Sequence, residues 1–290
     1  MYIHEAGAKT GLTKKAIAYY CEQGLVSPCV SDNGYREFTH RDVEILRTVS
    51  ILRRLGMPVR DIKTALQDTT GEALRQFSVQ LELQTQADQT KQDILRRVCE
   101  GGNDAEIQAA LDTLDNSTAI SQRILQAFPS YFGQFLCLHF ARFLKEPAVT
   151  DEQKKAYARI IRFLDTVTLD FPEDLQTLLR ESTPDSDIHW IDGMIQETGE
   201  LLKAPADYLR DHKQALEEYL AYRQSDEYRQ SPAFQLQSRM KALMASSGYY
   251  EEFIPAMKEL SPSYAAYAEQ LETANQVFLE QYPDAADRIS

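Results

Sequence analysis

Cysteine is scarce in this sequence: there are four among 290 residues, and no two of them form a C-x-x-C pair. A chain of this length can bury an adequate core without disulfides. Cys21, Cys29, Cys99 and Cys137 are therefore expected to be free thiols in a reducing cytosol. Their spacing is also unlike that of a zinc site, so we expect neither a disulfide framework nor a bound metal.

Long hydrophobic runs are absent. The most apolar stretch, residues 131–144, is shorter than a membrane-spanning helix and contains His139 and Arg142. Such a stretch is typical of a buried helix. The first residues also lack the basic segment and apolar stretch of a secretion signal. The sequence thus predicts a cytoplasmic protein that does not enter a membrane.

The common catalytic and nucleotide-binding motifs are missing as well. There is no G-x-x-x-x-G-K-[ST], no G-x-G-x-x-G and no G-x-S-x-G. The segment HEAGA at residues 4–8 begins like a zincin helix but has Ala8 where the second histidine belongs. Nothing places a nucleophile beside a base. We therefore expect the protein to be neither an enzyme nor a cofactor-binding protein. The alternative is an enzyme in a fused helical part, and a screen that detects no turnover would argue against it.

The charge, −13 overall, is unevenly distributed. Residues 1–66 hold ten Lys and Arg against seven Asp and Glu, a net of +3, whereas the remaining residues have a net of −16. Half of the twelve glycines also lie at or before Gly71. A basic, turn-rich head followed by an acidic, glycine-poor body indicates different partners for the two parts, and only the head suits phosphates.

The head begins with two short helices joined by a tight turn. The first ends at Gly11, and Thr13 is a good N-cap for the second, residues 14–23, which Gly24 ends. Two short helices joined in this way predict a helix-turn-helix.

A hairpin and two more helices complete the head. Asn33-Gly34 is the strongest short hairpin signal, because a type I′ turn needs positive φ at both central residues. Thr39 then caps a long helix, with Asp42 at the capping-box position. Gly56 ends that helix, and Pro58 opens the next one.

Residues 72–100 contain neither proline nor glycine and predict one uninterrupted helix. Its apolar residues follow a heptad, which is typical of a helix that pairs with another, and an isolated helix of this length is marginal in water. The predicted dimerisation residues are Leu74, Phe77, Leu81, Asp88, Lys91, Leu95 and Val98, with the polar members in the middle.

Beyond residue 102 the pattern is helical throughout, with prolines between the helices. We therefore expect a mainly α protein with three parts. These are a DNA-binding domain over 1–70, a long antiparallel coiled-coil dimerisation helix over 71–101, and an all-α effector domain over 102–290.

The order of elements in the first hundred residues resembles the MerR family of transcriptional regulators. The residues that carry the resemblance are Ile3, Glu5, Thr10-Gly11, Tyr19-Tyr20, Gly24-Leu25, Ser27-Pro28, Asn33-Gly34-Tyr35-Arg36, Asp42, Leu46, Leu55-Gly56 and Ile62. The resemblance implies a winged helix-turn-helix. The chain has Lys15 and Ala18 where members usually carry arginine, which implies an altered DNA preference.

The resemblance, with the position of each residue, predicts the DNA contacts. The helix over 14–23 would enter the major groove, the hairpin would lie along the backbone, and arginines around residues 53–60 would add a second backbone contact. The expected DNA-binding residues are Thr13, Lys14, Lys15, Tyr19, Tyr20, Tyr35, Arg36, Arg53, Arg54 and Arg60. At least one of the two adjacent tyrosines should instead pack in the core. Arg36 could alternatively pair with Glu37 or Asp42, and the other three arginines could be a solvated helix face.

The same resemblance implies a homodimer that reads a palindromic promoter element of double-stranded DNA and acts on RNA polymerase indirectly. Antiparallel pairing of the long helices would bring Asp88 and Lys91 to the two-fold axis, where they could pair between chains. The alternative is a frayed polar seam.

Aromatic residues in the body predict an effector site. The candidates are Trp190, Tyr219, Tyr222, Tyr249, Tyr250, Tyr264 and Tyr267, with Glu217, Glu218, Glu251 and Glu252 flanking the tyrosines. Such faces could hold an aromatic or cationic small molecule. Two alternatives remain open: the aromatics are helix-packing core, or the acidic body binds a protein rather than a small molecule.

Overall fold

The computed structural model describes residues 1–31, 34–128, 130–167, 172–182 and 188–285. As expected, the protein is mainly α-helical, with one two-stranded antiparallel hairpin near the N-terminus. The chain forms two compact units, Met1–Ser78 and Val79–Ser290.

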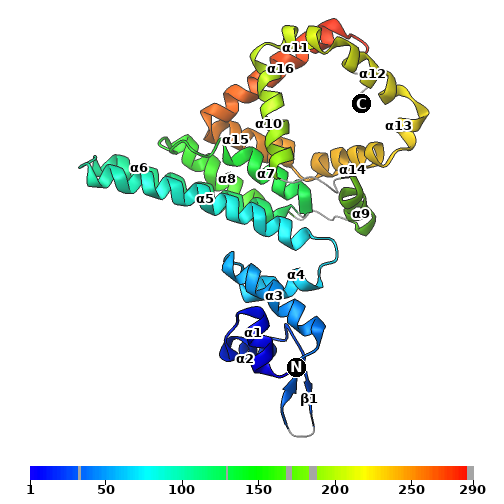
Figure 1. Ribbon diagram of the computed structural model, residues 1–290. Coiled ribbons are helices and arrows are strands. Elements are labelled where there is room, and N and C mark those ends of the chain that lie inside the picture. Colours follow the sequence, from blue (N-terminus) through cyan, green and yellow to red (C-terminus); the bar gives the residue numbers. More distant parts are fainter. Residues whose placement is uncertain (32–33, 129, 168–171, 183–187, 286–290) are drawn as a thin grey trace. The chain divides into compact units, whose positions relative to one another are not determined.

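The first unit is a helix-turn-helix with a hairpin and two further helices (Figure 1). Its elements are α1 (Ile3–Thr10), α2 (Lys14–Glu22), β1 (Cys29–Val30), β2 (Arg36–Glu37), α3 (His40–Arg54) and α4 (Val59–Gln67). Thr13 caps α2 by accepting a hydrogen bond from the backbone N–H of Ala16, and Thr39 and Asp42 form the expected capping box on α3. These caps satisfy backbone donors that the first helical turn leaves free.

A small apolar core holds the first unit together. Ile17 of α2, Leu46 and Val49 of α3, and Ile62 of α4 are all completely buried. Phe38, directly after the hairpin, is buried in the same cluster. The core therefore fixes α2 and the base of the hairpin in one body.

The strands on either side of Asn33-Gly34 form the predicted antiparallel hairpin. Val30 pairs with Arg36, and the backbone N–H of Ser31 donates to the carbonyl of Tyr35. The N–H of Gly34 donates to the carbonyl of Ser31, and Gly34 has a φ of 79°. Gly34 thus has the positive φ that hairpin turns commonly require. The type I′ turn predicted at Asn33-Gly34 includes Asn33, which lies outside the described residues, so the turn type stays a prediction.

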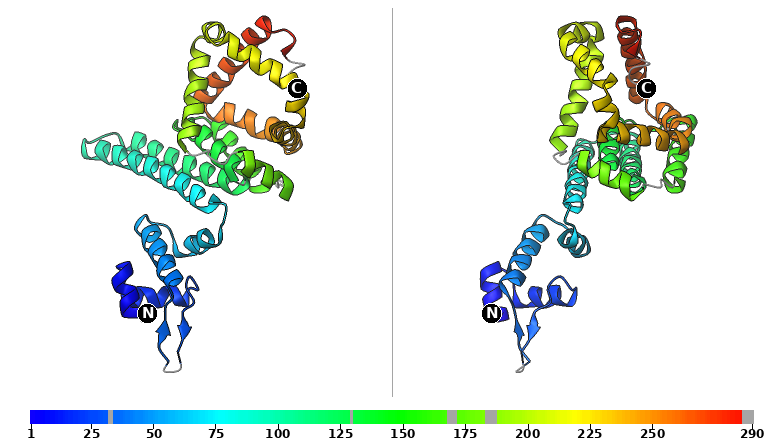
Figure 2. Two further views of the ribbon diagram at one scale, coloured as in Figure 1. Left: turned by 45° about the vertical axis from the view of Figure 1, so that its right-hand side comes forward. Right: turned by 90° about the vertical axis from the view of Figure 1, so that its right-hand side faces the viewer.

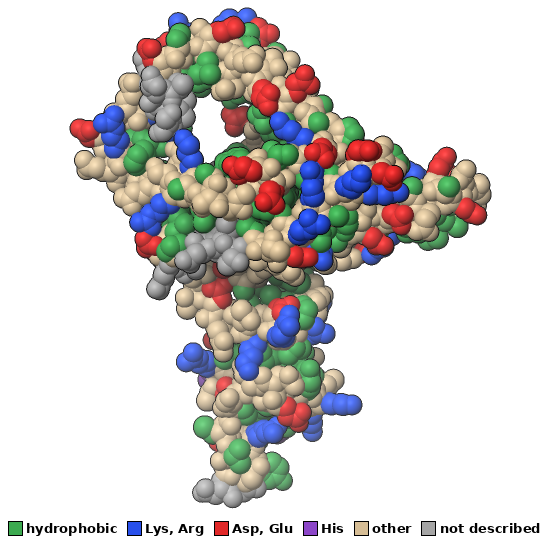
Figure 3. Space-filling model, turned by 180° about the vertical axis from the view of Figure 1, so that it is seen from behind, with side chains coloured by type: hydrophobic (Ala, Val, Ile, Leu, Met, Phe, Trp, Pro, Cys, Tyr) green, Lys and Arg blue, Asp and Glu red, His purple; other side chains and the backbone are tan. Residues whose placement is uncertain are grey.

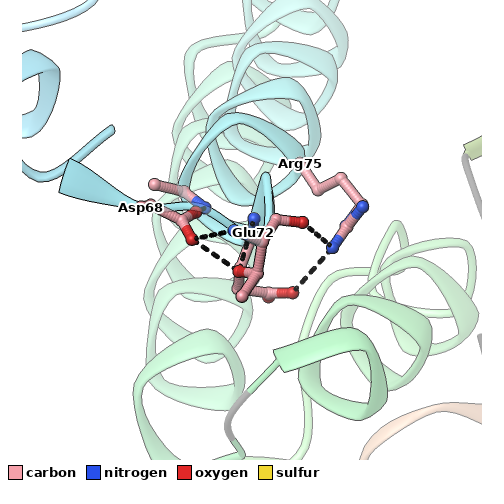
Figure 4. A network of polar contacts seen from close by, with 5 residues as sticks. Asp68, Glu72 and Arg75 are labelled. Atoms are coloured by element: carbon pink, nitrogen blue, oxygen red, sulfur yellow. Dashed lines mark hydrogen bonds and ion pairs between the residues drawn. The ribbon is translucent and has the colours of Figure 1, made fainter. Parts of the chain in front are cut away.

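A polar network joins α4 to the start of α5 (Glu72–Cys99), as Figure 4 shows. The Asp68 carboxylate accepts hydrogen bonds from the backbone N–H groups of Thr70 (2.8 Å) and Ala73 (2.7 Å), and from the Thr70 hydroxyl. Arg75 donates to the carbonyl of Thr70 and lies 3.7 Å from Glu72. Asp68 therefore satisfies a free N–H at the first turn of the long helix.

The second unit is all α-helical in its described part. After the remainder of α5 come α6 (Asp104–Ala127), α7 (Ser130–Ala141), α8 (Asp151–Thr166), α9 (Glu173–Ser182), α10 (Ile188–Lys203), α11 (Pro205–Asp211), α12 (Lys213–Gln224), α13 (Asp226–Gln230), α14 (Pro232–Ser246), η1 (Tyr249–Phe253), α15 (Ile254–Leu260) and α16 (Pro262–Gln281). The expected uninterrupted helix over 72–100 is α5, which runs antiparallel beside α6 (Figures 1 and 2).

The core of the second unit is mainly aromatic. Phe128, Phe140 of α7 and Phe253 of η1 are almost completely buried, and Ile160 of α8 and Met257 of α15 pack among them. Residues 131–144 are therefore a buried helix and its following turn, as their composition predicts.

Helices α10 to α14 leave this core and return to it at η1. Because α11 packs against α16, the segment closes into a ring of helices, which we call the helical ring (188–246 together with α16) (Figures 1 and 2). In the space-filling view the helical ring encloses open space (Figure 3). No helix within the described ranges has both the length and the apolar character needed to cross a membrane.

Candidate DNA-binding site and effector cavity

The first turn of α2 presents a positively charged surface. Lys14 and Lys15 are its first two residues, and both are exposed. The Thr13 hydroxyl accepts the N–H of Ala16 at 3.1 Å, so this side chain serves the helix as its cap. The buried Ile17 one residue later anchors the turn to the core. Two cations are thus held at the end of the helix that commonly reaches base edges.

The two adjacent tyrosines of α2 have different surroundings. Tyr20 is 7% exposed and belongs to the core, whereas Tyr19 is 45% exposed. Their ring centroids are 5.7 Å apart. As expected, one of the pair packs inside, and Tyr19 is the one whose hydroxyl can reach a phosphate.

The hairpin carries the second group of candidates. Tyr35 is 65% exposed, and Arg36 is exposed on β2. Within the described part of the chain no ion pair joins Arg36 to Glu37 or Asp42, and the Asp42 carboxylate already accepts from Thr39. Lys and Arg side chains project from the first unit in Figure 3. Arg36 is therefore available to a backbone phosphate.

The three arginines around the end of α3 are exposed but not equivalent. Arg53 donates to the carbonyl of Met57 at 2.7 Å and so closes the end of the helix. Arg60 lies 3.4 Å from Asp61 with its side chain 93% exposed, a contact of little energetic weight. Arg54 remains exposed to solvent. Arg54 and Arg60 are thus better placed than Arg53 to contact DNA.

Tyr2 was not among the DNA-binding residues predicted from the sequence. It is 41% exposed, and its ring packs edge-on against Tyr35 with centroids 6.1 Å apart. It lies just before α1, outside any periodic pattern, so only its aromatic character could have signalled it. Its contact with Tyr35 ties the start of the chain to the hairpin.

The heptad residues of α5 form an uncovered apolar stripe in the single chain. Leu74, Leu81, Leu95 and Val98 are each between 44% and 62% exposed, whereas Val79 and Ile94 on the other side of α5 are buried. Phe77, also predicted to lie in the stripe, packs partly against the core of the first unit.

The polar middle of this stripe is bonded within one helix. Lys91 pairs with Asp88 at 2.9 Å, and the Gln84 side chain donates to the same carboxylate at 2.9 Å. Pairing of Asp88 with Lys91 between two chains stays a prediction.

Two of the predicted aromatic groups already hold arginines of the chain itself. The Arg223 guanidinium lies over the rings of Tyr219 and Tyr228, at 5.8 Å and 4.5 Å from the centroids. Tyr222 contacts Tyr228 edge-on. The cation–π attraction expected for an effector is satisfied internally at this cluster.

The second such cluster surrounds Arg142. Its guanidinium lies 4.6 Å from the ring centroid of Phe143 and 4.9 Å from that of Tyr267. The buried Tyr264 packs against the same aromatic group through Phe143 and Tyr267. These tyrosines therefore belong to the core.

Tyr249 and Tyr250, in contrast, line a cavity of about 680 Å³. They lie on η1, where the backbone N–H of Ile254 donates to the carbonyl of Tyr249 five residues earlier. This π-type turn is a rare conformation that is frequent at functional sites. Trp190 lies on α10, but its side chain is outside the part of the protein that the structure describes.

The other residues that line the cavity were not predicted from the sequence. Sequence reasoning missed Gln237, Met240, Lys241 and Met244, which line it from one side of α14. Their i, i+3, i+4 and i+7 spacing is a helical stripe, but it mixes polar and apolar residues and so carries no signal by itself.

The cysteines and acidic residues show no metal arrangement within the described ranges, where no three His, Cys, Asp or Glu residues cluster suitably. Cys137 is buried, and desolvation raises its thiol pKa to about 12. The four cysteines are free thiols.

The geometry of the first unit defines the class of domain to which it belongs. A helix-turn-helix with exposed lysines at the start of its second helix, flanked by a two-stranded wing that carries an exposed arginine, is a winged helix-turn-helix DNA-binding domain. The family of MerR helix-turn-helix regulatory proteins matches residues 1–69. These residues belong to that family.

Individual relatives agree with this assignment. The HTH-type transcriptional regulator CueR of Yersinia pestis is 40% identical over 67 residues, which cover 23% of this chain and 48% of that protein. Nodulation protein NolA of Bradyrhizobium elkanii is 29% identical over 128 residues, 42% of this chain and 57% of that protein. The multidrug-efflux transporter 2 regulator of Bacillus subtilis is 28% identical over 74 residues, 24% and 27% of the two chains.

The chain thus spans about half the length of the first of these relatives. No solved structure matches it. The second unit, which holds the cavity, therefore has to be interpreted from its own residues.

Proposed function

We propose that the protein is a transcriptional regulator of MerR type that binds promoter DNA as a homodimer and responds to a small-molecule effector through its helical second unit. The observation that carries the DNA-binding part is the exposed Lys14-Lys15 pair at the start of a core-anchored α2. Arg36 on the wing adds a second point of contact with the duplex.

Two considerations support the homodimer: the weak DNA affinity expected of a single head and the exposed apolar stripe of α5. A single head with a net charge of +3 neutralises few phosphates, so it binds weakly by itself. The exposed apolar stripe of α5 supplies a surface on which two chains can pair. Two heads would then read the two halves of a palindrome, as dimeric helix-turn-helix proteins do.

The effector part rests on the cavity. A volume of about 680 Å³ lies within the range of sites for drug-sized ligands. This favours a small molecule over a protein as the partner of the second unit. An effector would act on RNA polymerase only indirectly, through a change in the angle between the two DNA-bound heads. As a regulator of this kind, the protein would work in the cytoplasm, without a catalytic step.

The test is selection of duplexes from a random library with the full-length chain, followed by titration of the selected sequence. We expect a palindromic site, and we expect Lys14→Ala/Lys15→Ala to weaken binding at least about tenfold, because two phosphate or base contacts are lost in each head.

The chain offers a matched control. Lys154-Lys155 is a second exposed lysine pair near the start of a threonine-capped helix, α8, in the other unit. Lys154→Ala/Lys155→Ala should leave DNA affinity within about twofold. Equal effects of the two double variants, or no complex even at low salt, would reject the proposed DNA-binding surface.

A further inference from the structure

The cavity of the second unit is open to solvent and lined by segments that are far apart in the sequence. Phe132 and Leu136 come from α7, Met240 and Met244 from α14, and Phe278 from α16. Tyr249 and Tyr250 of η1 complete the wall. A molecule in this cavity would touch the core of the unit and the helical ring together.

Most of this wall is apolar and adaptable. Phe132 contacts Phe128 edge-on with centroids 5.8 Å apart, and Tyr249 contacts the same ring at 6.3 Å. These rings are therefore fixed by the buried core. Met240 and Met244 face them from α14, and methionine side chains adjust to irregular shapes. The wall thus suits the apolar body of a ligand, with aromatic surface on one side and flexible thioethers on the other.

One polar group of the cavity, the Gln237 amide, is oriented as a donor by its neighbours. The side-chain oxygen of Gln237 accepts from Arg223 at 2.7 Å and from the Tyr228 hydroxyl at 2.7 Å. Because a guanidinium can only donate, this oxygen must face Arg223. The amide nitrogen of Gln237 is then the group left to bond with an occupant, and it can only donate. Asn275 and the exposed Tyr250 can each donate or accept, so they can bond with either kind of group.

The formal charges of the cavity lining also favour a hydrogen-bond acceptor or an anion as the occupant. Among the described residues that line the cavity, Lys241 is the only one with a formal charge, and none is Asp or Glu. Lys241 lies one helical turn after Gln237 on α14, on the same side of the helix. Within the described part of the chain no carboxylate pairs with Lys241. The cavity therefore combines an apolar wall with one cation that no described carboxylate pairs with and an oriented amide donor.

We propose that the cavity binds an apolar organic anion, a molecule with an aromatic or aliphatic body and a single carboxylate. The body packs between the α7 aromatics and the α14 methionines, and the carboxylate is held by Lys241 and the Gln237 amide. From the sequence we expected an aromatic or a cationic molecule. The cationic choice is disfavoured because two of the predicted tyrosine faces hold Arg223 and Arg142 instead. The assignment rests on the proposed function only in naming this molecule as the effector.

The experiment uses three probes that share a naphthalene ring: 1-naphthylacetate, 1-naphthaleneethanol and 1-naphthylethylammonium. Each is titrated into the full-length chain without DNA, and heat release gives the dissociation constants. We expect the anion to bind roughly fivefold more tightly than the neutral alcohol, the gain typical of one charge-assisted contact at a partly exposed site. The cation should bind most weakly.

Two substitutions and one control test the geometry. Lys241→Gln should abolish the preference for the anion while leaving the affinity for the alcohol unchanged, and its exposed position makes misfolding unimportant. Lys155→Gln, an equally exposed change on α8, should keep the preference. Met240→Trp should weaken all three probes by filling the cavity. Circular dichroism confirms that the variants are folded.

Cation binding as tight as that of the anion, an unchanged preference in Lys241→Gln, or no binding of any probe would each overturn the assignment. Because DNA is absent, the two proposals fail separately. A chain that prefers the anion but binds no duplex would overturn the proposed regulator and leave this site standing. A chain that binds its palindrome but shows no anion preference would overturn the anion site and leave the proposed regulator standing.

Discussion

His139 shows how burial sets the behaviour of a single residue. Its ring lies 5.9 Å from Phe135, 5.0 Å from Phe140 and 5.6 Å from Phe143. Desolvation, with a smaller contribution from the neighbouring Arg142 charge, lowers the His139 pKa from 6.5 to about 4. The imidazole is therefore neutral in the folded protein at physiological pH and packs as an aromatic ring.

This residue predicts a pH dependence of stability. The unfolded chain takes up a proton at His139 near pH 6.5, and the folded chain only near pH 4, so stability is complete above pH 6.5 and falls as the pH decreases toward 4. Each unit of pKa shift corresponds to about 1.4 kcal/mol, so the loss reaches up to about 3 kcal/mol. Urea unfolding of the second unit at a series of pH values measures it.

His139→Phe should flatten that part of the pH profile, because a ring that cannot be protonated takes its place. His212→Phe is the control, since His212 is exposed, and among the described residues its ring stacks on Tyr208 and bonds to the Tyr208 carbonyl. It should leave the profile unchanged. A wild-type curve that is flat between pH 6.5 and 4 would contradict the proposed burial of a neutral imidazole.

At the scale of elements, local chemistry predicts the helix starts best. Thr13, Thr39 and Asp42 cap the helices that their positions in the sequence indicate, because a side-chain oxygen next to a free N–H is a contact between near neighbours. The absence of proline and glycine likewise predicted α5. The Asn33-Gly34 signal predicted the hairpin in the same local way, and its strands pair Val30 with Arg36.

Asp68 was not predicted as a cap, because it lies four residues before α5 and reaches the helix through the turn. Burial by itself raises its pKa, but hydrogen bonds from the Thr70 hydroxyl and from the backbone N–H groups of Ala73 and Thr70 outweigh this, and the pKa is lowered. The carboxylate is therefore ionised near neutral pH, the form that caps best. Its contribution is lost only as the pH falls through that lowered value.

Asp68→Ala should destabilise the first turn of α5 by about 1 kcal/mol, the usual cost of losing a helix cap. Hydrogen exchange at the amide of Ala73, which now bonds to Asp68 at 2.7 Å, should become faster. Asp93→Ala on the same helix removes an exposed pair with Arg96 and should have little effect. Unchanged exchange at Ala73 would show that the junction does not depend on Asp68.

At the scale of the whole molecule, sequence patterns predicted the chain's class but not its cavity. The head is recognisable because its signals are local and ordered. The cavity forms only where α7, α14, η1 and α16 meet, and no pattern within one of these segments reveals that meeting. Tyr219 and Tyr222 illustrate this limit of sequence patterns. Their i, i+3 spacing puts them on one face of a helix, but only the fold shows that the Arg223 guanidinium lies over the ring of Tyr219.

The exposed stripe of α5 leads to the prediction on assembly. Leu81 is 44% exposed in the single chain and lies at a heptad position. Burying a leucine contributes about 1.5–3 kcal/mol, and a two-fold interface contains it twice. Leu81→Asp should therefore raise the dissociation constant of the dimer at least about 100-fold. Sedimentation of the full-length chain over a range of concentrations measures this.

The same substitution links assembly to DNA binding. Without a dimer the two heads no longer bind as one unit, so affinity for the palindrome should fall toward that for a single half-site, as when two binding modules lose their link. Leu271→Asp, on α16 and 39% exposed, changes a comparable leucine away from the stripe and should alter neither property. If Leu81→Asp remains a dimer of unchanged affinity, α5 is not the surface on which two chains pair, and the antiparallel pairing expected for the long helices fails with it.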